Sequence, residues 1–528
     1  MSVRRIIGSE TEYGISSKGG QYENHVSLSF DVVEAFRHMQ PELSHVRWDY
    51  GSEDPVHDAR GYHMPRAHVS SDLLTDREEL RATNAPQPNG ARVYVDHAHP
   101  EYSAPEVTTP RQALLYNRAG DLLMQTAVTQ FEQHTGRTLT LYRNNVDGKG
   151  ASWGSHENYQ VKRSVPFDDL AGLFMTHAIT RQIYTGSGRV GLGKKSEIPG
   201  FQLSQRADYV HTKIGLQTTF DRPIVNTRDE SHSTDEFRRF HVIVGDANRM
   251  DMPELLKYGT TSLIFWALEQ SCERGLDYQR FLAAIHLSNP VDALHRVSHD
   301  LSLKERQDMR AGEPLSAFQL QLRLKTWVYE VAAQVYGTDS QGEPLWPDED
   351  TREIIRLWNQ ALQDVACIAT ADETARLTLT EPAQRVEWFL KWQIMESMRR
   401  RKNTDWAHPM LQAMDISWAR LEDSSLWQKV SARSQHLISP EDIAHAAAHP
   451  PQDTRAFMRG FVLKNYAPYV VSVSWDLIAL REQAEDKAVI ISIDNPSQHT
   501  QEDYSRTFTV QPSIKEVLDW LKNQDTHR

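Results

Sequence analysis

Cysteine is scarce in this sequence, which contains only Cys272 and Cys367 among its 528 residues. Two cysteines so far apart in the chain cannot supply a cysteine-rich metal site, and neither lies in the sequence context of a thiol hydrolase. We expect both to be small buried side chains of a protein in a reducing compartment.

Long apolar runs and an excess of basic residues are also missing. No segment reaches the ~18–20 consecutive apolar residues of a membrane-spanning helix, and Glu10 stands where a signal peptide would carry its apolar stretch. The chain has 58 lysines and arginines against 71 acidic residues, a formal net charge of −13, which disfavours broad contact with phosphate backbones. We therefore expect a cytoplasmic protein that binds neither membranes nor nucleic acids.

The chain does contain enough apolar surface for a folded core. Hydrophobic residues make up 39% and aromatic residues 9% of the sequence, with 13 tryptophans, which argues against disorder. A chain of 528 residues can form up to about four domains, and it needs no disulfide or structural metal for stability.

Hydrophobic periodicity predicts a mixture of strands and long helices. Residues from about 45 to 90 have little periodicity and many Asp, Arg, Pro and Gly residues, which is typical of a functional or mobile loop. The pattern favours an α+β fold with a helical part after residue 253 and a small C-terminal unit. Strands are expected at residues 3–7, 91–96, 139–143, 155–161 and 241–245, and helices at 29–39, 110–134, 167–184, 254–274, 315–336, 350–369, 382–401 and 513–523.

Several carboxylates follow the alternation of strand side chains. Glu10 and Glu12 fall on one face of a strand, and Arg92, Tyr94 and Asp96 share a face for the same reason. Converging carboxylates repel one another unless a proton or a hard cation lies between them, and such oxygen ligands suit Mg²⁺. The candidate metal and nucleotide cluster is Glu10, Glu12, Glu101 and Asp96. Taken alone, a Glu-x-Glu strand is more often a solvated face.

Three further polar residues could face a ligand. His156 and Asn158 share one face of their strand, and His241 begins another strand. Arg228 is the best phosphate clamp in an arginine-rich stretch, because a guanidinium pairs well with phosphate. Core packing of the histidines and structural salt bridges of the arginine are the plain alternatives.

Three motifs point to chemistry that we do not expect here. Gly186–Gly191 fits the GxGxxG string, but a helical pattern precedes it, so a flexible loop carrying Arg189 is favoured over a dinucleotide-binding turn. His97-x-His99 lacks the Ser and Asp of zinc isopeptidases, because Val107 and Pro110 occupy those positions. The basic run 399–402 is expected to complement a helix dipole.

Seven long motifs stand out along the chain: Ile6–Ile15, Asn89–Glu106, Asn144–Tyr159, Gly200–Tyr209, Arg222–Glu230, Arg239–Asn248 and Thr454–Gly460. Taken together, they resemble the Pup ligase/deamidase family, whose members act on the prokaryotic ubiquitin-like protein Pup. Within it, Asp96-His-Ala-His-Pro-Glu101 and the long loop before residue 90 are similar to the deamidase and depupylase branch (Dop) rather than to the ligases. Thr11 and Ser231 depart from the usual pattern.

The resemblance implies a glutamine-synthetase-like catalytic domain, related to the carboxylate-amine ligases, in which a curved antiparallel sheet holds Mg²⁺ and ATP. This domain would span residues 1–450, with an inserted mobile loop at about 45–90, and a small C-terminal domain would span 451–528. Asp96 would be the catalytic carboxylate. The implied metal ligands are Glu10, Tyr94, Glu101, His156 and His241, and the implied nucleotide contacts are Arg92, Ser103, Asn158, Arg228 and Trp475.

The implied activity is hydrolysis of the isopeptide bond between the side-chain carboxyl of Pup's C-terminal residue and a substrate lysine. Deamidation of a C-terminal Gln would use the same site. The expected partners are Pup and pupylated proteins, with ATP and Mg²⁺ as cofactors. Two alternatives stay open: an ATP-consuming Pup ligase or related carboxylate-amine ligase, and a non-enzymatic Pup-binding adaptor.

Overall fold

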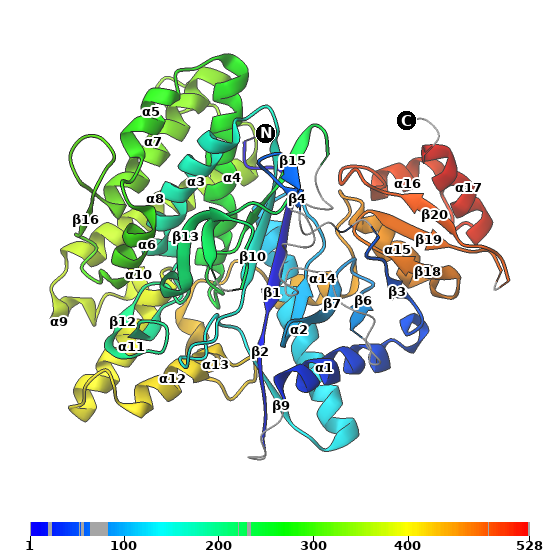
Figure 1. The fold of residues 1–528 in the computed structure, drawn as a ribbon, viewed down its shortest axis with the longest axis horizontal. Coiled ribbons are helices and arrows are strands. Elements are labelled where there is room, and N and C mark those ends of the chain that lie inside the picture. Colours follow the sequence, from blue (N-terminus) through cyan, green and yellow to red (C-terminus); the bar gives the residue numbers. More distant parts are fainter. Residues whose placement is uncertain are drawn as a thin grey trace.

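A six-stranded sheet lies at the centre of the computed structural model, which describes residues 2–18, 24–51, 53, 57–63, 83–219, 221–229, 234–483 and 485–525 (Figure 1). Every neighbouring pair of its strands is antiparallel, which confirms the α+β class. The strands in spatial order are β15 (Phe237–Val242), β10 (Ser155–Lys162), β1 (Ile7–Glu12), β8 (His99–Ser103), β7 (Arg92–Asp96) and β6 (Asn84–Pro86).

The two faces of this sheet differ in polarity. Along β1, buried Ile7, Ser9 and Thr11 alternate with half-buried Gly8, Glu10 and Glu12. The apolar face packs against three helices, of which α2 contacts β1, α4 contacts β10 and α1 contacts β6 to β8. These helices are α1 (His25–Met39), α2 (Pro110–Thr135) and α4 (Asp251–Arg274).

Helix α2 shows how local sequence sets the elements that support the sheet. Thr109 and Gln112 form a reciprocal capping box at its N-terminus, with Pro110 in the first turn. A Cβ on Gly120 would lie 2.4 Å from the Tyr102 ring. Only glycine therefore allows α2 to approach β8 so closely.

Most of the helical part forms a layer beside the sheet, on the left of Figure 1, whereas its last helix, at residues 440–448, packs against α2. Its long helices begin and end within a few residues of the predicted bounds, and Arg399 to Lys402 occupy the last turn of α11, as expected. The helices are α3 (Phe167–Thr185), α5 (Gln279–Ile285), α6 (Pro290–His299), α7 (Ala317–Tyr336), α8 (Glu349–Thr370), α9 (Glu373–Arg376), α10 (Thr380–Ala383), α11 (Glu387–Lys402), α12 (Pro409–Ala419), α13 (Leu426–Val430) and α14 (Pro440–Ala448).

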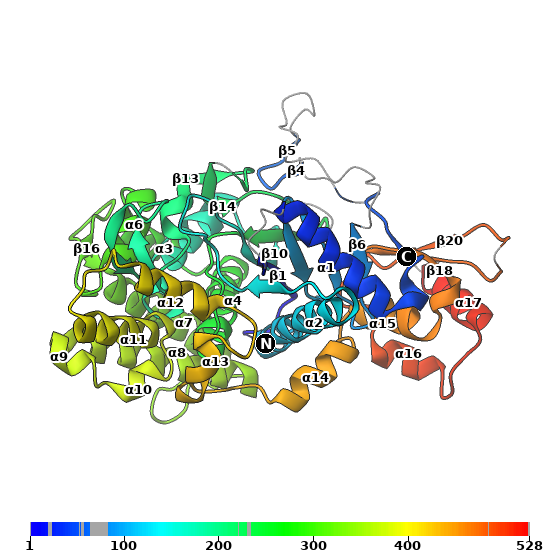
Figure 2. The same ribbon diagram turned by 90° about the horizontal axis from the view of Figure 1, so that it is seen from below.

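Short strands complete the body around this layer. They are β2 (Gly14–Ser17) with β9 (Leu139–Tyr142), β11 (Arg189–Leu192) with β12 (Ile198–Gln202), β13 (Val210–Gly215) with β14 (Arg222–Asn226), β16 (Arg306–Gln307) with β17 (Leu315–Ser316), and β4 (His57–Asp58) with β5 (Tyr62–His63). Figure 2 shows β4 and β5 at the margin of the molecule. Among the described residues, no helix combines the length and apolar character that crossing a bilayer requires.

The C-terminal unit has an apolar cluster of its own, to which residues before 50 contribute. Strand β3 (Arg47–Trp48) pairs in parallel with β18, and Leu43, Val46 and Trp48 are buried with residues 457–521. We therefore propose a division near residue 450 in which 43–48 pack with the C-terminal unit. Its elements are α15 (Ala456–Asn465), β18 (Val470–Val473), β19 (Leu477–Leu480), β20 (Val489–Ser492), α16 (Gln501–Thr507) and α17 (Ile514–Asp525).

Two sequence predictions are wrong, and one lies partly outside the described residues. Arg189 is buried at the start of β11 rather than carried by a flexible loop. Gly186 serves close packing, because its Cβ would lie 2.4 Å from the carbonyl oxygen of Leu203. Cys272 is half-buried and Cys367 is exposed, although we expected both to be buried. Of the 45–90 loop, residues 52, 54–56 and 64–82 lie outside the described residues.

Candidate active site

Strand register brings the candidate residues onto the polar face of the central sheet. Glu10 on β1 lies opposite both His156 on β10 and Ser103 on β8. Glu101 lies opposite Glu12 on one side and Tyr94 on the other. Residues from positions 10 to 241 of the chain therefore face one another across five strands.

The first ligand group consists of Glu10, His156 and His241, whose donor atoms lie within 4.8 Å of one another. Nδ1 of His156 is 3.0 Å from Oε2 of Glu10, and Nδ2 of Asn158 donates to Oε1 at 2.9 Å. Burial by itself would raise the pKa of Glu10, but the hydrogen bond from His156 and the charge of Arg239 hold it well below its usual range. Glu10 is therefore an ionised carboxylate.

His241 is prepared as a neutral donor in the same group. Burial, followed by the charge of Arg239, lowers the pKa of His241 well below its usual value. Nδ1 of His241 lies 2.8 Å from Oδ1 of Asn158, which orients the ring. A neutral imidazole held by a second polar group is the form that binds metal.

The second ligand group consists of Glu12, Asp96 and Glu101, also within 4.8 Å of one another. Burial and the charges of Asp96, Glu10 and Glu12 raise the pKa of Glu101 well above its usual range. Three converging carboxylates are the hard oxygen donors that Mg²⁺ prefers, and a cation would relieve their repulsion. The donor set therefore fits Mg²⁺.

The predicted metal ligands thus fall into two groups rather than one. We expected Glu10, Glu12, Glu101 and Asp96 to form one cluster, whereas Glu12 and Asp96 lie with Glu101 in the second group and Glu10 lies in the first. The hydroxyl of Tyr94 donates to Oε1 of Glu101 at 2.5 Å. Tyr94 therefore orients Glu101 in this structure, and its role as a metal ligand stays a prediction.

Asp96 lies at the end of β7, where the chain turns into β8. His97 follows with a φ of 53°, in the left-handed region, and its Nδ1 is 3.0 Å from Oδ1 of Asp96. Burial would raise the pKa of Asp96, but His97 and Arg228 lower it below its usual value. Asp96 is therefore ionised and has a cationic neighbour from a distant loop.

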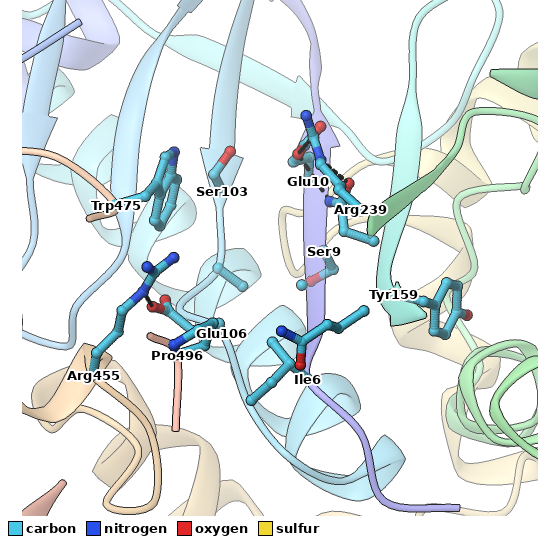
Figure 3. Close-up of a pocket in the computed structure, with 14 residues that line it drawn as sticks. Ile6, Ser9, Glu10, Ser103, Glu106, Tyr159, Arg239, Arg455, Trp475 and Pro496 are labelled. Carbon is cyan, nitrogen blue, oxygen red and sulfur yellow. Dashed lines mark hydrogen bonds and ion pairs between the residues drawn. The ribbon is translucent and has the colours of Figure 1, made fainter. Parts of the chain in front are cut away.

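A pocket of about 520 Å³ opens beside the first ligand group (Figure 3). Ser103, Asn158 and Trp475 line it, so three of the predicted nucleotide contacts surround one space. Arg92 and Arg228 are outside the set of described residues that line it.

Arg92 is held by aromatic and polar neighbours. Its guanidinium lies 3.9 Å from the ring centre of Tyr94 and 4.5 Å from that of Trp48, and it donates to Oη of Tyr50 at 3.0 Å. Trp48 in turn meets Trp475 edge to face. Arg92 thus connects the sheet, the segment before residue 51 and the Trp475 side of the pocket.

The sequence reasoning missed a buried ion-pair set at the pocket wall. Glu106 lies 2.7 Å from Nε of Arg455 and 2.5 Å from Nη2 of Arg459. Although burial would raise the pKa of Glu106, these two arginines lower it to about 2. The spacing of four between the arginines, which puts them on one helix face, was the available signal.

The sequence pattern also indicated Arg239 only as one of several arginines in its stretch. Nη2 of Arg239 donates to Oε1 of Glu10 at 3.0 Å. Alternation along β15 places this side chain on the face of His241. That alternation was the signal that could have identified it.

Comparisons with known proteins agree with this architecture. A family model described as Pup-ligase protein matches residues 5–479. The chain is 39% identical to a depupylase of Acidothermus cellulolyticus and 38% identical to a Pup deamidase/depupylase of Mycolicibacterium smegmatis, each over 90% of this chain and 91% of the relative. It is 31% identical to a Pup–protein ligase of Bifidobacterium adolescentis, over 79% of this chain and 84% of the ligase.

Solved structures of the ligase PafA share the fold. The PafA chain in a complex with Pup superimposes with a TM-score of 0.73 at 23% identity, covering 98% of this chain and 97% of that one. A PafA structure in complex with ADP gives a TM-score of 0.67 at 25% identity, covering 83% and 90%. The chain belongs to the Pup-ligase protein family.

Proposed function

We propose that this protein is a depupylase, a hydrolase that cleaves the isopeptide bond between Pup and substrate lysines and also deamidates a C-terminal Gln of Pup. The position of Asp96, an ionised carboxylate within the second group of candidate metal ligands, supports it most strongly. The identities of 37–39% to depupylases, against 28–34% to Pup–protein ligases, favour hydrolysis over ligation.

The proposal includes Mg²⁺ and ATP as cofactors. Glu10, His156 and His241 would hold one metal, and Glu101, oriented by Tyr94, would hold metal with the second group. The nucleotide would lie against Ser103, Asn158 and Trp475, with Arg92 and Arg228 as further contacts. When bound, Mg²⁺ would supply positive charge that stabilises a developing oxyanion.

Asp96 would act on the side-chain carbonyl of Pup's C-terminal residue. It either attacks the carbonyl carbon or removes a proton from a water that attacks it. When a water attacks, the proton that Asp96 removes passes to the lysine nitrogen as the bond from carbon to that nitrogen breaks, and the carboxylate of Pup is released. When Asp96 itself attacks, the amine leaves with a proton from solvent, and a water then hydrolyses the anhydride that joins Asp96 to Pup. In deamidation the leaving group is ammonia. His97 and then Arg228 lower the pKa of Asp96, which keeps it in the ionised form that both routes require.

Pup and pupylated proteins are the proposed partners, and the cytoplasm is the proposed compartment. ATP is expected to serve as a bound cofactor rather than as a consumed fuel, because isopeptide hydrolysis is downhill. Stoichiometric release of ADP during isopeptide formation would support the ligase alternative instead.

The test is to incubate a purified Pup–protein conjugate with ATP and Mg²⁺ and to follow free Pup on a gel. The rate of Pup release by Asp96→Asn should be at least about 100-fold lower than that of the wild type. Asp308 is a 71% exposed carboxylate in the helical part, so Asp308→Asn should match the wild type. Near-full activity of Asp96→Asn would contradict the assignment of Asp96. Binding of the conjugate without release of Pup by the wild type would favour the adaptor.

A further inference from the structure

Arg239 lies in contact with the first ligand group. From β15, its Nε donates to Oδ1 of Asn158 on β10 at 2.8 Å, and its Nη2 donates to Oε1 of Glu10 on β1 at 3.0 Å. The same Nη2 is 3.2 Å from Nδ1 of His241. The side chain is only 8% exposed. Its positive charge therefore lies against two of the side chains, Glu10 and His241, that would hold a metal.

A guanidinium in this position competes with a divalent cation. Arginine stays protonated at all ordinary pH values, so its charge cannot be removed to make room. Two cations beside the same buried carboxylate repel each other strongly, because little water screens them. A metal that binds Glu10 and His241 must therefore displace the Arg239 guanidinium.

The displaced guanidinium would have a place to go. Arg239 also lines the pocket together with Ser103, Asn158 and Trp475, and Figure 3 shows its side chain against Glu10, which lines the same pocket. Its planar fork of donors matches the oxygens of a phosphate group. A small rotation of the side chain would exchange the carboxylate of Glu10 for a phosphate in the pocket.

We propose that Arg239 couples the binding of metal and nucleotide: it occupies the first ligand group when the site is empty and binds a nucleotide phosphate once a metal has taken its place. The inference rests on the proposed nucleotide site and assigns a residue to its regulation. Metal alone then binds weakly because it must displace a charge, and the nucleotide repays that cost by accepting the displaced guanidinium. Such reciprocal coupling between two ligands is typically 5- to 150-fold.

The test measures binding rather than catalysis. Mn²⁺ binding in the absence of nucleotide is measured by the electron paramagnetic resonance of free Mn²⁺, and ADP binding in the presence of Mg²⁺ is measured by calorimetry. Arg239→Gln should bind Mn²⁺ alone at least about fivefold more tightly than the wild type and ADP at least about fivefold more weakly. An unchanged or weaker Mn²⁺ affinity, or an unchanged ADP affinity, would overturn the proposal.

Two further variants make the result specific. Arg239→Lys keeps the charge next to Glu10, so its Mn²⁺ affinity should stay close to the wild type; tightening equal to that of Arg239→Gln would contradict charge competition. Arg238→Gln removes the neighbouring arginine, whose side chain bonds the Arg163 and Val165 carbonyls on the opposite face, and should change neither affinity. Thermal unfolding checks that each variant is folded, and Arg239→Met repeats the test if Gln destabilises the protein.

Failure of this inference and failure of the proposed function give different results. Neither binding measurement involves cleavage of a bond. If Arg239→Gln shows the two opposed changes in affinity but the wild type releases no Pup from conjugates, the coupling is supported and the depupylase function is contradicted. If the wild type cleaves conjugates but Arg239→Gln shows no opposed changes in affinity, the depupylase function is supported and the coupling is contradicted.

Discussion

Glu12 on β1 lies directly opposite Glu101 on β8, with Asp96 completing a group of three carboxylates. Like charges directly opposite on adjacent strands destabilise a sheet. Burial, and then the charges of its acidic neighbours, raise the pKa of Glu101 well above its usual range, which is the direction that this repulsion produces. The polar face of the sheet is therefore built at a cost in stability, which a bound cation would remove.

A divalent cation should consequently stabilise the protein. We expect Mg²⁺ or Mn²⁺ to raise the melting temperature, because an ion that binds only the folded state shifts the equilibrium toward it. Glu12→Gln should be more stable than the wild type without metal and should lose most of the metal-induced shift. Calorimetric melting with and without metal checks this. A less stable Glu12→Gln that kept the full shift would contradict it.

The ion pairs of Glu106 should hold the strand region and the C-terminal unit together. Arg455 and Arg459 are 1% and 0% exposed, so Glu106→Gln would leave two buried charges without their carboxylate. Breaking a buried pair from one side costs about 3–5 kcal/mol. Urea unfolding should show this loss in the free energy of unfolding, whereas the exposed Glu441→Gln should lie within about 0.5 kcal/mol of the wild type.

The same glutamate predicts a dependence of stability on pH. Its pKa is about 2 in the folded protein and about 4.3 when unfolded, so the unfolded chain binds the proton more readily. The stabilisation, about 3 kcal/mol, is fully present above pH ~4.3 and is lost as the pH falls toward the folded value. The difference in unfolding free energy between wild type and Glu106→Gln should therefore shrink below pH ~4.3. A constant difference from pH 7 to 3 would argue against the ion pair.

Trp475 should contribute to nucleotide affinity. It lines the pocket and meets Trp48 with ring centres 5.0 Å apart, and stacking of a base on an aromatic ring is worth about 1–3 kcal/mol. Trp475→Ala should weaken ADP binding about 5- to 150-fold, while Mn²⁺ binding without nucleotide changes little. Trp406→Ala, which removes a ring packed on Phe201 in the helical part, serves as the control. Equal effects of the two variants on ADP affinity would contradict a role for Trp475.

The sequence by itself determined which side chains share a face of one strand. Alternation along the strands correctly placed Glu10 and Glu12 on one face of β1, and His156 and Asn158 on one face of β10. Neighbouring strand residues must point to opposite faces. The capping box of α2 was equally local. The long motifs also identified the family, which the comparisons confirm.

Only the tertiary structure decided which strands are neighbours and what the polar side chains contact. Glu10 and Arg239 are 229 residues apart in sequence, yet the order β15-β10-β1 puts their side chains 3.0 Å apart. Residues 47–48 similarly fall within the predicted loop in sequence, but in the structure they pair with a strand of the C-terminal sheet. Strand order and register are set by burying apolar faces against distant helices, and local periodicity contains no record of those partners.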